Sequence, residues 1–180
     1  MATSLIRRAA WPLAAALALA FLIGLALHGQ RPDAGLAAFK AGGLLTAFAP
    51  EDAREVEILS GGETWRFRRD DGRWRLMVAP RPVPADADKR VESALGLLRN
   101  AAPLRLLTDQ EIGPTMPADY GLGEAALRVS VRGPGDARFV IRFGAANPLG
   151  LAHYTRVDGV AGVPLLPSYV TDAWRQAIGH

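Results

Sequence analysis

Residues 55–78 have the sequence EVEILSGGETWRFRRDDGRWRLMV, in which apolar and polar side chains alternate over three short runs. Gly61-Gly62 and Asp71-Gly72 separate the runs, and both pairs are typical of two-residue turns between antiparallel strands. Because side chains point to alternate faces of a strand, this segment predicts a three-stranded meander.

The two turns also predict the register of the meander. The first places Ser60 opposite Glu63, and the second places Phe67 opposite Leu76 and Trp65 opposite Val78. The predicted apolar face consists of Val56, Ile58, Trp65, Phe67, Leu76 and Val78. The predicted outer face carries Glu55, Glu57, Arg66, Arg68, Arg75 and Met77. Both turns give the same apolar face, which supports the meander.

A cluster of arginines lies in this segment, namely Arg66, Arg68, Arg73 and Arg75. It could bind an anionic ligand or be neutralised by its neighbours. The register places Glu57 opposite Arg66 and Glu55 opposite Arg68, and such a pair contributes ~0.2–1 kcal/mol. We therefore expect a solvated face that neutralises itself.

A helix is predicted after the prolines at 80, 82 and 84. Asp86 or Asp88 can cap it, and it runs to about Asn100. Its apolar stripe, which we expect to cover the sheet, is Val91, Ala94, Leu95 and Leu98. A strand at residues 103–107 then leads into a long loop, residues 108–124.

Strands followed by a helix recur in the second half of the chain. Alternation predicts strands near 127–132, 139–143, 153–157 and 163–166, and a closing helix over Ser168–Ile178. We therefore expect an α+β fold of antiparallel β-meander units, each followed by a helix, as in a βββα duplication. The two units could lie side by side or share one sheet.

An uncharged segment, Ala9–Leu27, follows Arg7-Arg8 near the N-terminus. Only Pro12 and Gly24 among its 19 residues are not apolar, and as a helix it would be about 28 Å long, close to the thickness of a bilayer core. We expect a retained single-pass transmembrane anchor at residues 9–27, with residues 1–8 in the cytoplasm. Residues 28–54 would be a linker with a short helix near 36–45, and residues 55–180 a periplasmic domain of a bacterial inner-membrane protein.

Other interpretations of this segment remain open. A cleaved signal peptide usually has a shorter apolar run and a small-x-small cleavage site, whereas this run continues into Leu27–Pro32. A buried core helix would need a larger protein around it. Arg7-Arg8 resembles the start of a twin-arginine signal, but the residues that follow do not extend the resemblance.

Composition restricts the classes of partner and site. The chain has 21 basic and 18 acidic residues, and the excess is only one without Arg7 and Arg8. We therefore expect no nucleic-acid partner, because that function needs a clustered basic surface. Cysteine is absent from the sequence, which excludes disulfides and thiolate metal sites.

No catalytic motif is recognisable in the sequence. His28, His153 and His180 are isolated from one another, and the serines lie outside any Gly-x-Ser-x-Gly context. His153 is more typical of a partly exposed strand residue than of a metal ligand. We expect no enzyme activity, catalytic residue, metal or cofactor.

The loops are the best candidates for a working surface. Met116, Tyr120 and Leu122 could form an apolar contact patch, or Tyr120 and Leu122 could be buried as core. The second candidate loop runs from Asn147 to His153 and could equally be a plain connection. The candidate interaction surface is therefore Met116, Tyr120, Leu122, Asn147 and His153.

Several short motifs resemble an uncharacterised envelope domain found in proteins encoded beside ABC-transport components, including gliding-motility-associated auxiliary proteins. These motifs are Tyr120-Gly121-Leu122, the strand Leu127–Arg132, Phe143-Gly144, the turn Asn147–Gly150 and Tyr154-Thr155-Arg156. The resemblance covers roughly residues 55–178. It implies a membrane-tethered accessory domain of unknown function, with no established catalytic residues.

Three classes of function follow from these features. We expect an accessory or scaffolding protein with an integral-membrane partner. The alternatives are a periplasmic ligand-binding or sensing module, whose small-molecule ligand would be unknown, and an enzyme.

Overall fold

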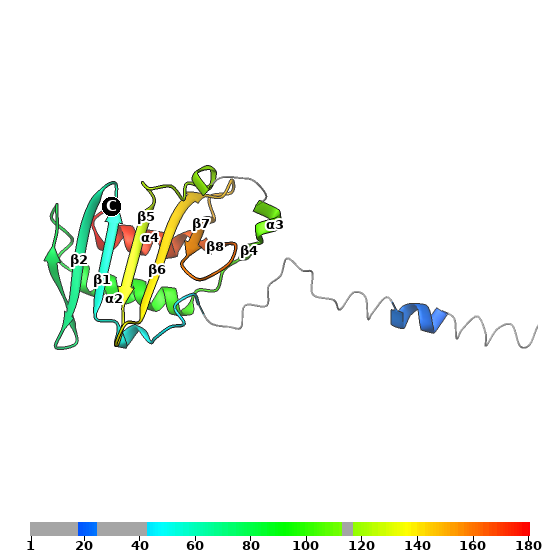
Figure 1. Cartoon of the computed structure of the whole chain (residues 1–180), viewed down its shortest axis with the longest axis horizontal. Coiled ribbons are helices and arrows are strands. Elements are labelled where there is room, and N and C mark those ends of the chain that lie inside the picture. The colour runs from blue at the N-terminus through cyan, green and yellow to red at the C-terminus, as the bar shows by residue number, and fades with distance from the viewer. Residues whose placement is uncertain (1–17, 25–42, 113–116) are drawn as a thin grey trace, which may run out of the picture. The chain divides into compact units, whose positions relative to one another are not determined.

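The computed structural model describes residues 18–24, 43–112 and 117–180 (Figure 1). The chain divides into two compact units, Met1–Leu36 and Ala37–His180, and each is considered by itself. In the first unit, residues 18–24 are helical, and the remainder of the predicted anchor lies outside the described residues. Within the described part of the chain, no helix has the length and hydropathy that crossing a membrane requires.

The second unit is built on one antiparallel sheet of eight strands. The strands are β1 (Glu55–Ser60), β2 (Glu63–Asp70), β3 (Arg73–Val78), β4 (Arg105–Leu107), β5 (Leu127–Arg132), β6 (Arg138–Ala146), β7 (Ala152–Val157) and β8 (Val163–Pro167). Their order across the sheet is β3-β2-β1-β5-β6-β7-β8-β4. The predicted α+β class is therefore confirmed, and the two sets of strands share one sheet.

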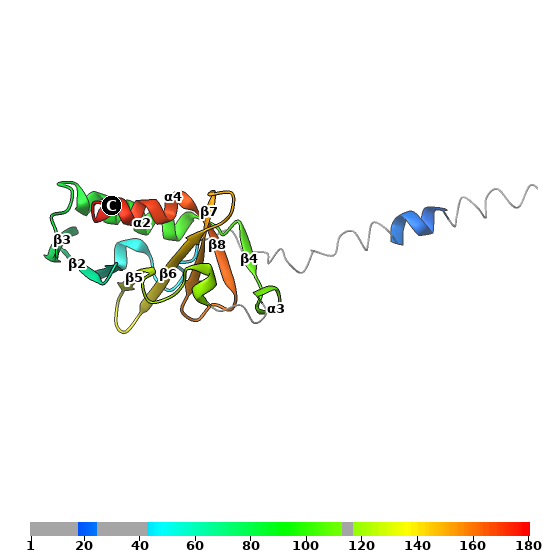
Figure 2. The same cartoon turned by 90° about the horizontal axis from the view of Figure 1, so that it is seen from above.

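Two helices, α2 (Ala87–Asn100) and α4 (Ser168–Ala177), cover the same face of the sheet (Figure 2). The shorter elements are η1 (Pro50–Asp52), α3 (Asp109–Ile112) and η2 (Pro117–Tyr120). Asp86 occupies the N-cap position of α2, as expected, but its side chain makes no capping hydrogen bond. Its Oδ1 instead accepts a hydrogen bond from Arg90 Nε at 2.8 Å, and this ion pair lowers the pKa of Asp86.

The predicted register of the first hairpin is confirmed. Ser60 pairs with Glu63, Ile58 with Trp65 and Val56 with Phe67. Asp71 and Gly72 in the second turn both have positive φ, as a type I′ turn requires. The two-residue turns therefore set the pairing between neighbouring strands, as the sequence predicts.

The second hairpin departs from its predicted register at one point. Phe67 pairs with Leu76 as expected, but Val78 pairs with Arg66 instead of Trp65. The register shifts between Arg66 and Phe67, so Met77 is an extra residue on β3 and Val78 turns to the outer face. Val78 is accordingly 46% exposed, and its assignment to the apolar face was wrong.

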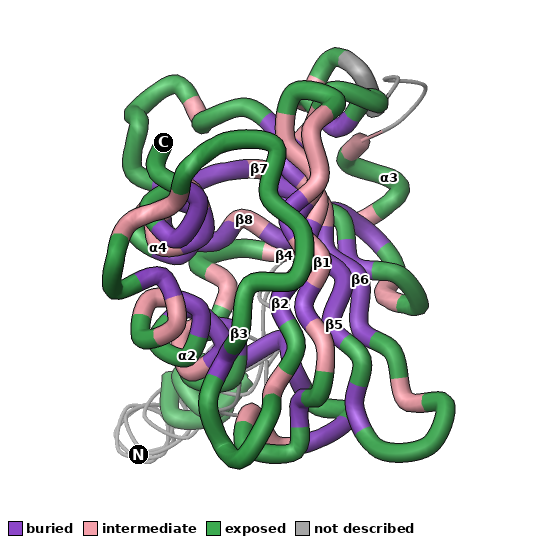
Figure 3. The backbone as a smooth tube through the Cα atoms, turned by 90° about the vertical axis from the view of Figure 1, so that its left-hand side faces the viewer, coloured by how far each residue is buried: buried purple, intermediate pink, exposed green. Residues whose placement is uncertain are grey.

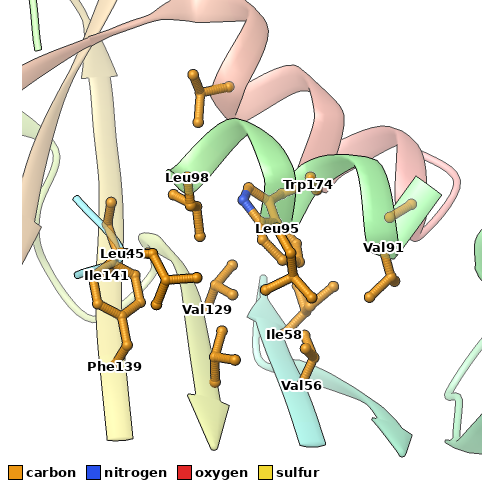
Figure 4. Packing of buried hydrophobic residues seen from close by; sticks show 14 of the residues in the cluster. Leu45, Val56, Ile58, Val91, Leu95, Leu98, Val129, Phe139, Ile141 and Trp174 are labelled. Carbon is orange, nitrogen blue, oxygen red and sulfur yellow. The ribbon is translucent and has the colours of Figure 1, made fainter. Parts of the chain in front are cut away.

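The helices and the covered face of the sheet enclose the hydrophobic core (Figure 4). All four residues of the predicted α2 stripe are buried, as are Val170 and Trp174 of α4. Buried and less buried residues alternate along β1 and the first part of β2 (Figure 3). The predicted face of α2 is thus confirmed by the packing.

The core begins earlier in the chain than expected. Leu44, Leu45 and Phe48 fell within the predicted linker, yet all three belong to the core. The Gly43 and Leu45 backbone N–H groups donate hydrogen bonds to the Arg99 and Leu98 carbonyls at the end of α2. No N–H group within the helix donates to these two carbonyls, because they lie in its last turn. The segment therefore supplies the missing donors and buries its leucines at the same time. The helix predicted near residues 36–45 lies mostly outside the described residues, and residues 43–45 are not helical.

Candidate interaction surface

Three arginines stand in a row on the outer face of the sheet, which is the face turned away from α2 and α4. Arg128 on β5 pairs with Arg142 on β6, and Arg142 pairs with Arg156 on β7. We call these three residues the arginine row. Residues on this row point away from the core because Val129, Ile141 and Val157, their buried neighbours along each strand, point into it.

The arginine row differs in its partners from the outer face of the first meander. Arg66 Nη2 donates to Glu57 Oε2 at 2.8 Å, and Arg66 Nε lies 3.4 Å from Glu55 Oε1. The hydrogen bond to Glu57 raises the pKa of Arg66. Among the described residues, no carboxylate lies within ion-pair distance of Arg128 or Arg142. The row therefore carries positive charge that the sheet itself does not neutralise.

The predicted neutralisation of the first meander holds only in part. Glu57 pairs with Arg66 as expected, and Arg75 Nε lies 3.3 Å from Asp70 Oδ2. Glu55 was expected to neutralise Arg68, but its carboxylate lies beside Arg66 and Arg132 instead. The reason is that β5 lies beside β1 and brings Arg132 opposite Glu55.

A solvent-open hollow of about 540 Å³ lies over one end of the arginine row. Its lining residues are Leu59, Leu122, Gly123, Glu124, Ala126, Arg128 and Arg142. Leu59 pairs with Arg128, so the hollow spans β1, β5 and β6. Two cations and two leucines thus line one hollow, with the carboxylate of Glu124 also among the lining groups.

A second hollow of about 470 Å³ shares part of this wall. Its lining residues are Gly121, Gly123, Glu124, Ala125, Ala126, Leu127, Phe143, Gly144, Ala145 and Arg175. Gly123, Glu124 and Ala126 therefore border both hollows. Gly123 and Glu124, which are exposed, can therefore be reached from two sides.

The segment that forms this wall crosses β6 at very short range. A Cβ atom on Gly144 would lie 2.2 Å from the Tyr120 carbonyl oxygen, and one on Gly121 would lie 2.5 Å from Ala145 N. Gly121 also has a φ of +69°, which favours glycine. Glycine at both positions lets the two backbones touch, and this contact places Leu122 beside the hollow.

The structure gathers three of the candidate residues around Gly144. The Tyr120 ring packs against the Tyr154 ring with their centroids 4.8 Å apart, and Leu122 is buried. His153 Nδ1 donates to the Gly144 carbonyl at 3.0 Å. His153 is 7% exposed, so the expectation of a partly exposed histidine was wrong; burial is possible because the polar ring nitrogen has this partner.

The two remaining candidates do not join this group. Asn147 Oδ1 accepts hydrogen bonds from the Leu151 and Ala152 backbone N–H groups, so its side chain holds the β6–β7 loop together. Met116 lies outside the described residues. In the part of the chain that the structure describes, no three His, Cys, Asp or Glu side chains are grouped as metal ligands would be.

The loop predicted over residues 108–124 contains short helical elements in its described portions. Thr108 Oγ1 accepts from the Glu111 backbone N–H, while Glu111 Oε2 accepts from the Thr108 N–H at 2.8 Å. This is a capping box, and the sequence Thr-x-x-Glu was its signal. The Thr108 N–H and then Arg105 lower the pKa of Glu111.

Arg128 and Arg142 were not among the residues predicted to form a site. Their alternation with Val129 and Ile141 predicts that they lie on the outer face, but it does not show what lies beside them. The hollow forms because Leu59 of β1 and Leu122 of the preceding loop border the same strands. Both neighbours come from distant parts of the sequence.

No family model, curated protein or solved structure matches this chain. The resemblance to the envelope domain therefore stays a prediction.

Proposed function

We propose that this chain is a single-pass, membrane-anchored periplasmic accessory or scaffolding protein of a membrane complex. The observation that carries the proposal is the uncharged segment Ala9–Leu27 behind Arg7-Arg8. Its apolar length suits a bilayer, and its flanking charges suit retention of the N-terminus in the cytoplasm. The anchor would hold the α+β domain beside a partner embedded in the same membrane.

The resemblance to transport-associated envelope domains supports a complex connected with ABC transport. A further support is the open outer face of the sheet, because α2 and α4 cover only the other face. The part of this face that neither the helices nor residues 120–122 cover, together with its hollows, is available for contact with another protein. We assign the contact to the outer face around residues 121–126.

A periplasmic ligand-binding or sensing module is the second candidate function. The hollow of about 540 Å³ favours it, because ligand sites commonly have volumes of about 300–1,000 Å³. Arg128 and Arg142 would select a small anion there. This function predicts saturable binding of a small carboxylate or phosphate without any protein partner.

The order of the elements also supports a duplicated βββα unit. β1 and β5 are neighbours, and each is followed outward by its own hairpin strands, β2-β3 and β6-β7. Each set leads to one of the two helices that pack on each other. The second set has β8 in addition, which we attribute to an extension of the repeat.

Membrane fractionation in a Gram-negative host tests the anchor. We expect the full chain to remain with the membrane after high-salt and alkaline washes, and to be released by detergent. Added protease should remove the domain from spheroplasts but not from intact cells. A full-length chain that washes off as a soluble protein would overturn the proposal, as would protection of the domain in spheroplasts.

Co-purification from the native cell in a mild detergent tests the scaffold function. We expect one integral-membrane protein to be recovered in constant ratio with the tagged full chain. The matched control is the same tag on an unrelated single-pass protein. Recovery of no membrane protein above that control would leave the ligand-binding alternative, which calorimetry with small carboxylates would then address.

A further inference from the structure

Charge is strongly segregated on the folded domain. Residues 43–180 contain seventeen basic and seventeen acidic side chains, so the domain has no formal net charge. The paired strands nevertheless place nine arginines on the outer face, against three carboxylates. The arginines are Arg66, Arg68, Arg73, Arg75, Arg128, Arg132, Arg138, Arg142 and Arg156, and the carboxylates are Glu55, Glu57 and Asp70. A neutral domain therefore presents one cationic face.

Several of these arginines stand directly opposite one another on neighbouring strands. The pairs are Arg68 with Arg75, Arg128 with Arg142, Arg132 with Arg138, and Arg142 with Arg156. Like charges in directly opposed positions destabilise a sheet. Arg142 takes part in two of the four pairs, so repulsion on this face is most concentrated at the arginine row. An anion bound at the row would relieve that repulsion.

The pair Arg128–Arg142 is distinguished from the other pairs by its surroundings. It lines the hollow together with Leu59 and Leu122, of which Leu122 is only 6% exposed. Guanidinium groups bind carboxylates through two parallel hydrogen bonds. The hollow thus combines groups for a carboxylate with groups for an apolar neighbour.

We propose that the arginine row and its hollow bind an extended acidic segment of the partner protein. This inference rests on the proposed accessory function and specifies the chemistry of the partner. Adjacent strands lie about 4.8 Å apart, so the row extends over roughly 10 Å. An extended peptide places alternate side chains about 7 Å apart on one side, so carboxylates at alternate positions fall within reach of the row.

The observations favour an acidic polypeptide over an anionic lipid surface. Arg128 and Arg142 line a hollow that a peptide side chain can enter, whereas a bilayer presents a broad surface. Glu124 lines the same hollow, and Glu55 and Glu57 lie within the same cationic face. These carboxylates would be repelled by a continuous layer of phosphates, while a peptide can place its acidic side chains between them.

Fluorescence anisotropy on the full chain in a nonionic detergent tests this inference. The probe is a dye-labelled short peptide of alternating glutamate and alanine, and its matched control has glutamine in place of every glutamate. We expect saturable binding of the acidic peptide that weakens with added salt, and no binding of the glutamine peptide. The double variant Arg128→Gln/Arg142→Gln should weaken binding about tenfold or more, because charged hydrogen bonds are lost.

The matched control variant is Arg68→Gln/Arg75→Gln. It removes a directly opposed arginine pair from the same face, away from the hollow. We expect it to change the affinity less than about threefold, since distant exposed charges act only through a screened field. Equal weakening by both double variants would overturn the assignment of the site, because overall charge would then explain the binding.

Vesicles containing phosphatidylglycerol provide the opposing test. Binding to these vesicles without binding to the acidic peptide would overturn the inference in favour of a lipid surface, and binding to neither would also overturn it. Failure here is distinguishable from failure of the proposed function. The peptide assay does not depend on the anchor, and the fractionation experiment does not depend on the arginines.

Discussion

The indole N–H of Trp74 donates a hydrogen bond to the carboxylate of Glu92 across the edge of the domain, with Nε1 and Oε2 2.8 Å apart. Arg69 Nη2 binds the same oxygen at 2.5 Å, and the Arg69 guanidinium lies 4.6 Å from the centre of the Trp74 ring. Trp74 is buried although β3 is an edge strand. The Glu92 carboxylate therefore joins α2 to both strands of the outer hairpin.

Replacing Glu92 with alanine should lower the free energy of unfolding by about 1–2 kcal/mol. The change removes the acceptor for the Trp74 N–H, and an unsatisfied buried donor costs about that much. Urea unfolding followed by tryptophan fluorescence measures the loss. Asp86→Ala is the control, because its ion pair with Arg90 is exposed to solvent and should contribute little to stability. Equal losses for the two variants would contradict the role of Glu92.

Phe67→Ala should cost about 3–5 kcal/mol of unfolding free energy. Phe67 is 1% exposed in the core, and removing a buried aromatic ring leaves a cavity. Arg68→Ala, one position along the strand, should cost less than about 1 kcal/mol because its side chain is exposed. Two small and equal losses in denaturant unfolding would show that the faces of β2 are assigned wrongly.

Gly43→Ala should destabilise the domain by about 1–3 kcal/mol. A Cβ atom there would lie 2.2 Å from the Leu98 carbonyl oxygen, so backbone would have to move. Thermal unfolding measures the effect. The control is Gly96→Ala within α2, where a Cβ meets nothing within 4 Å and alanine should stabilise by about 0.5–1 kcal/mol. A neutral Gly43→Ala variant would indicate that residues 43–48 are a linker after all.

The capping box at Thr108 and Glu111 should respond to acid. The Thr108 N–H and Arg105 lower the pKa of Glu111 in the folded state, so the ionised carboxylate is the form that holds the turn. Its contribution is therefore present above the usual glutamate pKa of about 4.3 and is lost as the pH falls through the lower folded value. Carbon-detected NMR titration of the Glu111 carboxyl should give a midpoint below that of an exposed glutamate.

Thr108→Ala tests whether the hydrogen bonds with Thr108 cause the lowered pKa of Glu111. It keeps the backbone N–H but removes the hydroxyl that accepts from the Glu111 N–H and also donates to the carboxylate. We expect the Glu111 midpoint to move up toward its ordinary value. A midpoint unchanged in Thr108→Ala and also in Arg105→Gln would contradict the assigned causes.

Local pairing could be predicted because its determinants are close in the sequence. The Gly61-Gly62 turn and the alternation around Ile58 and Trp65 give the observed register directly, since each turn joins the strands that it pairs. The same holds for the buried stripe of α2, which follows from helical spacing alone. The shift near Met77 could not be predicted, because a bulge changes the pairing without a residue type that marks it.

Contacts between segments that are far apart in the sequence could not be predicted, because they depend on packing. Gly43 and Leu45 lie on the end of α2 because the last carbonyls of that helix need donors and the core has room for two leucines. Nothing in the composition of residues 28–54 distinguishes the buried part from the rest. The candidate residues Tyr120, Leu122 and His153 converge on Gly144 for a similar reason, namely a close backbone crossing that only glycine permits.

By itself the sequence determined the α+β class, the meander, the buried stripe of α2 and the outward direction of Arg66, Arg128 and Arg142. These properties follow from the periods of strands and helices and from short turns. Only the tertiary structure decided that β5 lies beside β1, which aligns Arg128 and Arg142 with Leu59 and leaves them without a carboxylate partner among the described residues. Strand order in a sheet is set by burial of the whole apolar face, and that is a property of the complete domain.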